Sequence, residues 1–258
     1  MHEYIYTVYI YTYIYIFESV QIIIVNIDMR FVKQLDELPV QNMDLVNSGK
    51  EQRRKHSFLL PNTIRGIVVG PSNCGKTNVM LTLIEHSNGL KFENLYIYSK
   101  SLHQPKYQYL KKVLTSIKGM GYYSYTDNSE ICPVDTVRKN SIFIFDDIAC
   151  DKQDNIRAYF CMGRHSGIDC FYLCQTYTRI PKHLIRDNAN FIIAFKQDDL
   201  NLKHIYNDHV NTDMSFEQFK QLCAHCWTKD KYGFVTIDKD SSIENGRYRQ
   251  RFDTYIKF

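Results

Sequence analysis

From residue 58 onward, short apolar runs alternate with longer segments in which apolar and polar residues are mixed. The runs occupy residues 64–69, 94–98, 141–145, 168–174 and 190–195. Their shortness and their β-branched and aromatic content are typical of strands buried on both faces. The segments between them are long enough for helices. This alternation predicts an α/β domain, with a mostly parallel sheet flanked by helices on both faces and ligands at the carboxyl ends of the strands.

Residues 1–57 follow a different pattern. From Tyr4 to Ile16 tyrosine alternates with β-branched residues, and an apolar stretch follows over residues 20–25. A β-strand, a membrane segment and low-complexity sequence are the three interpretations. Low complexity is favoured, because the tyrosine content is unlike a leucine-rich spanning helix and Glu18 interrupts the run, so no membrane partner is expected. We therefore predict an N-terminal extension over residues 1–57 and a folded domain over residues 58–258.

Composition limits the protein class. A chain of 258 residues that is 44% hydrophobic can bury one sizeable core but is too short for two full domains. The net charge of +4 is compatible with a polyanion partner, although it does not establish one. Eight cysteines without a preceding secretory signal indicate reduced thiols and an intracellular location.

Residues 70–77 complete the phosphate-loop pattern G-x-x-x-x-G-K-[ST]. The run before them is strand-like, and a helix is predicted to continue over residues 78–84. In such a loop, backbone N–H groups surround the phosphates of ATP, a lysine reaches their oxygens, and a hydroxyl helps to hold Mg²⁺. The pattern predicts a P-loop NTPase. Its nucleotide-binding residues are Gly70, Pro71, Ser72, Asn73, Cys74, Gly75, Lys76, Thr77 and Asn78.

A second motif is the apolar run 141–145 that ends in Asp146 and Asp147. A carboxylate at a strand end beside a phosphate loop can complete the magnesium shell, and a second one can orient and deprotonate the attacking water. We assign the first role to Asp146, together with Thr77, and the second to Asp147. The alternative is an ordinary acidic turn after a strand, which would be the preferred interpretation if the chain had no phosphate loop.

A third motif is a Gly-Arg-x-x-Gly-Ile turn at residues 163–168, followed by an apolar run that ends in Gln175 and Thr176. A glutamine at that position can lie between the γ-phosphate and the attacking water. The turn carries Arg164, for which a plain surface arginine is the alternative.

These motifs, in this order over about residues 60–200, resemble the FtsK/HerA superfamily of DNA-pumping ATPases. Within it, the loop sequence and Gln175-Thr176-Tyr177 are most similar to the genome-packaging ATPases of poxvirus-type DNA viruses, virophages and related virus-like transposons. The resemblance implies a P-loop NTPase fold of the RecA-like, ASCE type, with ATP and Mg²⁺ as cofactors and double-stranded DNA as the partner. It also implies a homo-oligomeric ring of five or six subunits, capsid proteins as further partners, and action in the host cytoplasm or nucleus, where virions assemble.

The resemblance carries roles to this chain residue by residue. Lys76 and Thr77 match the phosphate and magnesium contacts, Asp146 the metal-shell acid, and Gln175 the sensor. Arg164 matches the arginine offered to a neighbouring subunit's nucleotide, where it neutralises charge on the transferring phosphoryl group. Most members carry glutamate where this chain has Asp147, so the shorter side chain departs from the pattern at the catalytic base.

Two function classes follow from the motifs. An ATP-driven translocase of double-stranded DNA is favoured by Gln175 and Arg164, and a phosphotransferase or nucleotide-dependent switch on the same scaffold is the alternative. Near the chain end, residues 247–252 interleave arginine with aromatic residues. This pattern suits either a DNA contact in a pore or a terminal strand with one solvated face.

Overall fold

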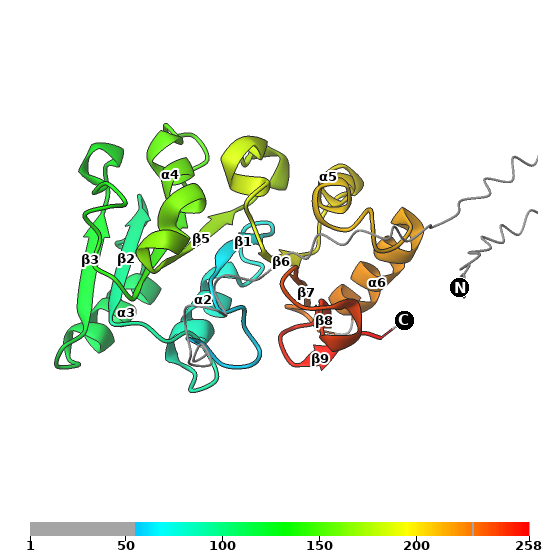
Figure 1. The fold of residues 1–258 in the computed structure, drawn as a ribbon, viewed down its shortest axis with the longest axis horizontal. Helices are drawn as coiled ribbons and strands as arrows, with labels where there is room; N and C mark the ends of the chain where they lie inside the picture. Colours follow the sequence, from blue (N-terminus) through cyan, green and yellow to red (C-terminus); the bar gives the residue numbers. More distant parts are fainter. Residues whose placement is uncertain (1–54, 229, 258) are drawn as a thin grey trace, which may run out of the picture. The chain divides into compact units, whose positions relative to one another are not determined.

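The computed structural model describes residues 55–228 and 230–257, and these contain a nine-stranded sheet (Figure 1). Its order is β3–β2–β4–β5–β1–β6–β7–β8–β9. The strands are β1 Arg65–Val69, β2 Asn94–Ser99, β3 Gly121–Tyr125, β4 Ser141–Asp146, β5 Ile168–Cys174, β6 Phe191–Phe195, β7 Phe234–Asp238, β8 Tyr248–Gln250 and β9 Thr254–Tyr255.

The strands from β3 to β6 are all parallel, which confirms the predicted sheet. All five apolar runs form strands within one residue of the predicted bounds. β5 lies between β1, which precedes the phosphate loop, and β4, which ends in the paired acids. The carboxyl ends of these three strands therefore meet at one edge of the sheet.

Five helices within the described part of the chain cover the two faces of the sheet (Figure 1). α2 and α3 pack with Val68 of β1 on one face, whereas α4, α5 and α6 pack with Ile67 and Val69 on the other. Successive strand residues point to opposite faces, so one strand contributes to both cores. The helices are α2 Lys76–Glu85, α3 Pro105–Thr115, α4 Asp154–Met162, α5 Asp199–His209 and α6 Phe216–Thr228. Shorter helical turns occupy Asn128–Glu130, Gly163–Ser166, Tyr177–Arg179, Lys182–Arg186 and Ile243–Asn245.

The antiparallel strands β7, β8 and β9 extend the sheet beyond β6. The terminal-strand interpretation of residues 247–252 is confirmed, but its solvated face is wrong, because all three residues of β8 are buried. Arg249 is 1% exposed, and its Nη2 lies 2.7 Å from Asp238 Oδ2. Arg247 Nη1 donates to Asp213 Oδ2 at 2.8 Å. The Arg249 guanidinium is therefore buried in an ion pair and is not available to DNA phosphates, whereas Arg247 is paired with Asp213 and partly exposed.

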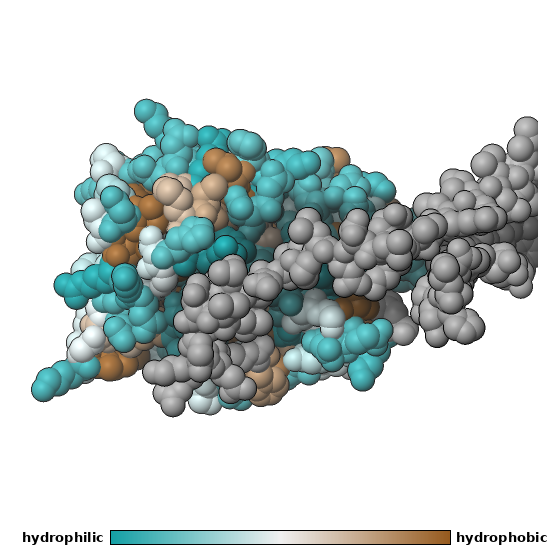
Figure 2. Space-filling model, viewed as in Figure 1, coloured by the Kyte–Doolittle hydropathy of each residue, from teal (hydrophilic) through white to brown (hydrophobic). Residues whose placement is uncertain are grey.

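On the face shown in Figure 2, hydrophobic residues form small separate areas among hydrophilic ones. All eight cysteines lie within the described ranges, and each is unpaired. Within these ranges, no helix has the length and apolar character needed to cross a membrane. The low-complexity interpretation of the tyrosine-rich start concerns residues outside the described ranges.

Candidate nucleotide-binding site

The phosphate loop connects β1 to α2 and depends on its two glycines. Gly75 has φ 110°, a left-handed conformation that side chains with a Cβ disfavour. A Cβ on Gly70 would lie 2.6 Å from the Cβ of Phe195 and from the Sγ of Cys74. The loop can therefore curl tightly only with glycine at both positions, which leaves a cradle of backbone groups at the start of α2.

Lys76 is the first residue of α2, and its ammonium group lies over the loop. The Nζ atom donates hydrogen bonds to the carbonyl oxygens of Gly70 at 2.6 Å and Pro71 at 2.9 Å. A positive charge thus lies beside the helix N-terminus, where the helix dipole also favours anions. This is the charge arrangement that a polyphosphate requires.

The paired acids lie at the end of β4. Asp146 is 8% exposed, whereas Asp147 is exposed and has φ 56°, which turns the chain sharply after the strand. The Asp147 backbone N–H donates to Leu173 O at 3.3 Å and so ties this turn to β5. Burial raises the pKa of Asp146 above its ordinary value, and the neighbouring Asp147 raises it further, while Tyr107 and Lys76 act in the opposite direction. A nearby cation would therefore strongly favour the charged form.

Gln175 links the loop to the paired acids. Its Oε1 accepts a hydrogen bond from Ser72 Oγ at 3.2 Å, and its Nε2 donates to Asp147 Oδ1 at 3.4 Å. Both bonds are long and exposed, so the side chain can exchange partners at small cost. The sensor position therefore connects the phosphate loop with the residue assigned as the base.

Tyr107, on α3, is a site residue that sequence reasoning missed. Its hydroxyl, on a side chain that is 3% exposed, donates a short hydrogen bond to Asp146 Oδ2. Burial raises the pKa of Tyr107, and Asp146 raises it further, so the phenol stays a donor. Because Ser99 of β2 pairs with Asp146, the chain entering α3 passes beside the acid. That strand order cannot be read from the sequence.

The loop, the paired acids and Gln175 line a polar cleft of about 380 Å³, which Tyr107 adjoins only through Asp146. Six of the nine predicted nucleotide-binding residues line it, as do Asp146, Asp147 and Gln175. Gly70, Pro71 and Cys74 do not line it, and Cys74 packs instead against the core beside α2. Residues that the sequence did not assign to the site also line the cleft: Ser101, Gln104, Lys106, Leu173, Cys174 and Tyr232.

The side chains of Thr77 and Asp146 both face this cleft and offer hard oxygen ligands. Magnesium is commonly held by one or two protein oxygens together with substrate phosphates and water, so this donor set fits Mg²⁺. Among the described residues, no group of three or more His, Cys, Asp or Glu side chains could hold a metal ion by itself.

Arg164 does not lie at this cleft. It is in the turn before β5, and β5 ends beside the loop, where Cys174 O accepts from Gly70 N at 3.2 Å. Seven strand residues span about 20 Å at roughly 3.3 Å each. Arg164 and the phosphate loop of the same chain therefore lie at opposite ends of β5.

Solved structures with a similar fold include the genome packaging NTPase B204 from Sulfolobus turreted icosahedral virus 2 in complex with sulfate. That comparison has a TM-score of 0.52 and 14% identity, and it covers 76% of this chain and 98% of the other. The same protein in complex with ATP-gammaS gives 0.48 and 14%, with coverage of 75% and 98%. The large terminase from a thermophilic bacteriophage in complex with ADP gives 0.31 and 16%, with coverage of 43% and 33%.

At 14% identity, the similarity to B204 in complex with sulfate shows a shared P-loop fold and nothing beyond the fold. No curated protein sequence matches the chain significantly. The model of one protein family, described as "Poxvirus A32 protein", matches residues 51–254. This match includes the loop, the paired acids, the Arg164 turn and strands β7 and β8. The chain therefore belongs to the poxvirus A32 protein family.

Proposed function

We propose that this protein hydrolyses ATP with Mg²⁺ and uses the energy to move double-stranded DNA into a capsid. The observation that carries the proposal is the convergence of Lys76, Asp147 and Gln175 on one cleft, from the segments that follow the adjacent strands β1, β4 and β5. Membership of the A32 family supports it, as does the likeness to a protein described as a genome packaging NTPase. We assign the ATPase domain to residues 58–258 and its action to the site of virion assembly, in the host cytoplasm or nucleus.

The roles follow from the position of each group. Lys76 and the N–H groups of the loop bind the β- and γ-phosphates, and Thr77 and Asp146 hold the magnesium ion. When bound, the ion neutralises charge on the phosphate oxygens. Asp147 orients a water molecule and accepts its proton, and Gln175 positions that water. Because Gln175 also contacts Ser72, a change at the γ-phosphate would be transmitted to β5.

Arg164 supports a ring. An arginine that stabilises the transferring phosphoryl group must reach it, and Arg164 is about 20 Å from the loop of its own chain. Its role therefore requires the cleft of a neighbouring subunit, in a ring of five or six copies. Hydrolysis would then depend on assembly.

The test measures ATP hydrolysis by the full chain with and without long double-stranded DNA. The variants are Lys76→Ala, Arg164→Ala, and Lys118→Ala as an exposed-cation control outside the cleft. We expect DNA to stimulate hydrolysis, Lys76→Ala to abolish it, Arg164→Ala to reduce it about 10³-fold, and Lys118→Ala to leave it unchanged. Hydrolysis indifferent to DNA and to Arg164 would favour the phosphotransferase or switch.

A mixing experiment tests the placement of Arg164. Lys76→Ala chains keep Arg164 but have a defective loop, and Arg164→Ala chains have the reverse defect. If Arg164 acts between subunits, mixed rings regain hydrolysis that neither variant shows alone. Absence of recovery, with mixed assembly demonstrated, would contradict the placement in trans.

A further inference from the structure

A groove of about 330 Å³ continues from the phosphate cleft toward the antiparallel edge of the sheet. The two share Gly75, Asn78 and Tyr232 as lining residues, so they are continuous. The rest of the groove is lined by residues of α2, the strand ends β6 and β7, and the turn between β8 and β9: Val79, Thr82, Phe195, Phe234, Arg251, Phe252 and Asp253.

The strand order gives the groove a direction relative to the phosphates. The acids and Gln175 end β4 and β5, which lie on one side of β1, whereas the groove lies by β6 and β7 on the other side. A triphosphate with its γ-phosphate at the acids therefore directs its nucleoside into the groove. Along α2, Thr82 is four residues beyond Asn78, or about 6 Å, which is within reach of a ribose and base.

The lining suits a flat heteroaromatic group. Tyr232 is 47% exposed at the junction of cleft and groove, and its ring carbon Cδ1 lies 3.8 Å from where a Cβ on Gly75 would be. The Lys231 ammonium lies 5.3 Å from the Tyr232 ring centroid. At the polar rim, Arg251 Nη2 pairs with Asp230 Oδ2 at 2.9 Å. Aromatic rings with a polar rim offer stacking together with hydrogen-bond partners.

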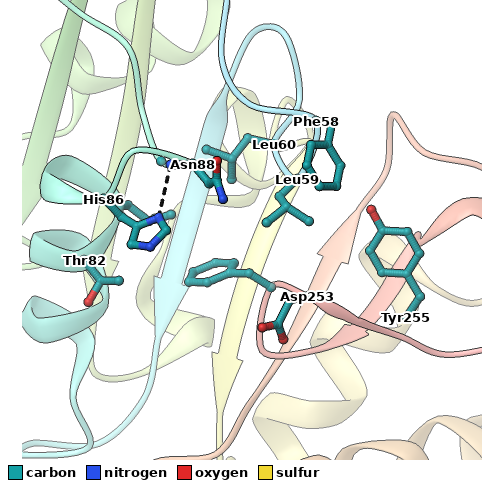
Figure 3. A pocket seen from close by; sticks show the side chains of 11 residues that line it. Phe58, Leu59, Leu60, Thr82, His86, Asn88, Asp253 and Tyr255 are labelled. Carbon is teal, nitrogen blue, oxygen red and sulfur yellow. Dashed lines mark hydrogen bonds between the residues drawn. The ribbon is translucent and has the colours of Figure 1, made fainter.

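A larger, more apolar cavity of about 750 Å³ lies farther along α2 (Figure 3). In Figure 3, Thr82 of α2 and His86, which follows α2 directly, lie on one side of it, with Asp253 and Tyr255 on the opposite side. It shares Thr82, Phe252 and Asp253 with the groove but no residue with the phosphate loop. His86 is ten residues beyond Lys76, about 15 Å along the helix, so this cavity lies beyond the nucleoside.

We propose that the groove is the nucleoside subsite, in which the purine base stacks on Tyr232. The inference rests on the proposed function, since the base belongs to the nucleotide whose phosphates occupy the cleft. The Arg251 guanidinium and the Asp253 carboxylate lie at the rim, where the ribose hydroxyls and the polar base edge would find partners.

The test separates base binding from phosphate binding. Equilibrium affinities for MgATP and for magnesium tripolyphosphate are measured with the full chain and with Tyr232→Ala, Tyr232→Phe and Tyr255→Ala. We expect Tyr232→Ala to weaken MgATP about tenfold without changing tripolyphosphate affinity, because stacking on one base is lost. Tyr232→Phe keeps the ring and should bind MgATP like the wild type. Tyr255→Ala, an exposed tyrosine of the Figure 3 cavity, should change neither affinity.

Any of three results with the variants would overturn the subsite: unchanged MgATP affinity in Tyr232→Ala, equal weakening of both ligands in Tyr232→Ala, or selective weakening of MgATP by Tyr255→Ala. Tripolyphosphate bound by the wild type as tightly as MgATP would also overturn it, yet leave the phosphate loop assigned. If the wild type binds neither ligand, the proposed function fails and the subsite fails with it.

Discussion

The two ends of the parallel strands carry similar polar residues in opposite environments. At the carboxyl ends, Asp147 and Gln175 are exposed and joined by a 3.4 Å hydrogen bond. At the amino end of β5, Asp169 is 1% exposed and accepts from Lys55 Nζ at 2.6 Å and Ile64 N at 2.7 Å. A buried carboxylate whose oxygens already accept several short hydrogen bonds stabilises the fold. An exposed carboxylate with one long hydrogen bond is available to a ligand.

Asn190, just before β6, extends the contrast. It is 3% exposed, accepts from Arg65 N at 2.8 Å, and donates to Thr63 O at 2.8 Å and Asp240 Oδ2 at 2.7 Å. Gln175, an amide at the opposite edge, bonds through its side chain to two other side chains, at 3.2 and 3.4 Å. The comparison teaches that the position of a polar residue, at the amino or the carboxyl ends of the strands, decides more than its type whether it stabilises the fold or serves the site.

The largest expected effect is on catalysis at the carboxyl end. Asp147→Asn should lower the rate of ATP hydrolysis about 10³-fold, because the amide cannot accept the proton of the attacking water. The urea midpoint should not change, since Asp147 is exposed. Steady-state kinetics and urea unfolding monitored by circular dichroism measure both. A large loss of stability in Asp147→Asn would contradict the view that the carboxyl end serves chemistry and not stability.

An aspartate-to-asparagine substitution at the amino end of β5 should reduce stability and leave catalysis unchanged. Asp169→Asn should lower the free energy of unfolding by about 3 kcal/mol, because Lys55 and the buried His56 lose their charged partner. The rate of hydrolysis per folded molecule should stay at the wild-type value. Urea unfolding and the rate normalised to folded protein check this. A slower rate with full stability would assign the amino end a catalytic role.

His209, which contacts Tyr177 just beyond the carboxyl end of β5, tests whether a buried group at this end contributes to stability. Its Nε2 lies 2.7 Å from the hydroxyl of Tyr177, and burial, together with Lys239 and Arg186, lowers the pKa of His209 to about 3. Below the ordinary value of 6.5 the unfolded chain binds a proton that the folded chain does not. Stability should therefore be complete above pH 6.5 and fall toward pH 3, by at most about 1.4 kcal/mol per pH unit.

Urea unfolding at pH 7, 6 and 5 measures this dependence, with His209→Gln as the comparison. Since glutamine does not titrate, the variant should lose this part of the pH dependence. An identical slope in both proteins would show that other groups cause it.

The smallest expected effect is at Tyr107. Tyr107→Phe removes the donor to Asp146 and should cost about 1 kcal/mol of stability, the ordinary net value of a hydrogen bond. It should also change, by a few fold, the Mg²⁺ concentration that gives half-maximal hydrolysis. Tyr98→Phe is the matched control, because Tyr98 donates to Asp151 Oδ2 at 2.6 Å outside the cleft. If both variants shift the Mg²⁺ requirement equally, Tyr107 has no special role at the site.

The five strands that the sequence predicts have residues buried on both faces. β1, β2, β4, β5 and β6 are apolar on both sides and therefore produce continuous runs. β3 was missed, because this edge strand is only partly buried and reads Gly-Tyr-Tyr-Ser-Tyr. β7, which reads Phe-Val-Thr-Ile-Asp, is fully buried and is not among the strands predicted from the sequence.

The site was predicted to the extent that its residues are local in the chain. The phosphate loop is one continuous segment, and each acid or glutamine ends a recognisable strand. Tyr107 and Tyr232 come from segments whose neighbours depend on strand order. Arg249 could not be assigned from the sequence, because a pattern of cations and aromatic residues does not show which group an arginine contacts. Its burial beside Asp238 follows from β7 and β8 pairing.

The sequence by itself determined the phosphate loop, the paired acids and the parallel α/β core, because glycine conformation, strand burial and helix position are local properties of the chain. Only the tertiary structure decided which strand ends are neighbours. That order placed Tyr107 on Asp146, opened the groove beside Tyr232, buried Arg249, and put Arg164 at the far end of β5 from its own loop. Contacts between segments distant in sequence depend on how the sheet is assembled, and residue patterns along the chain do not encode that assembly directly.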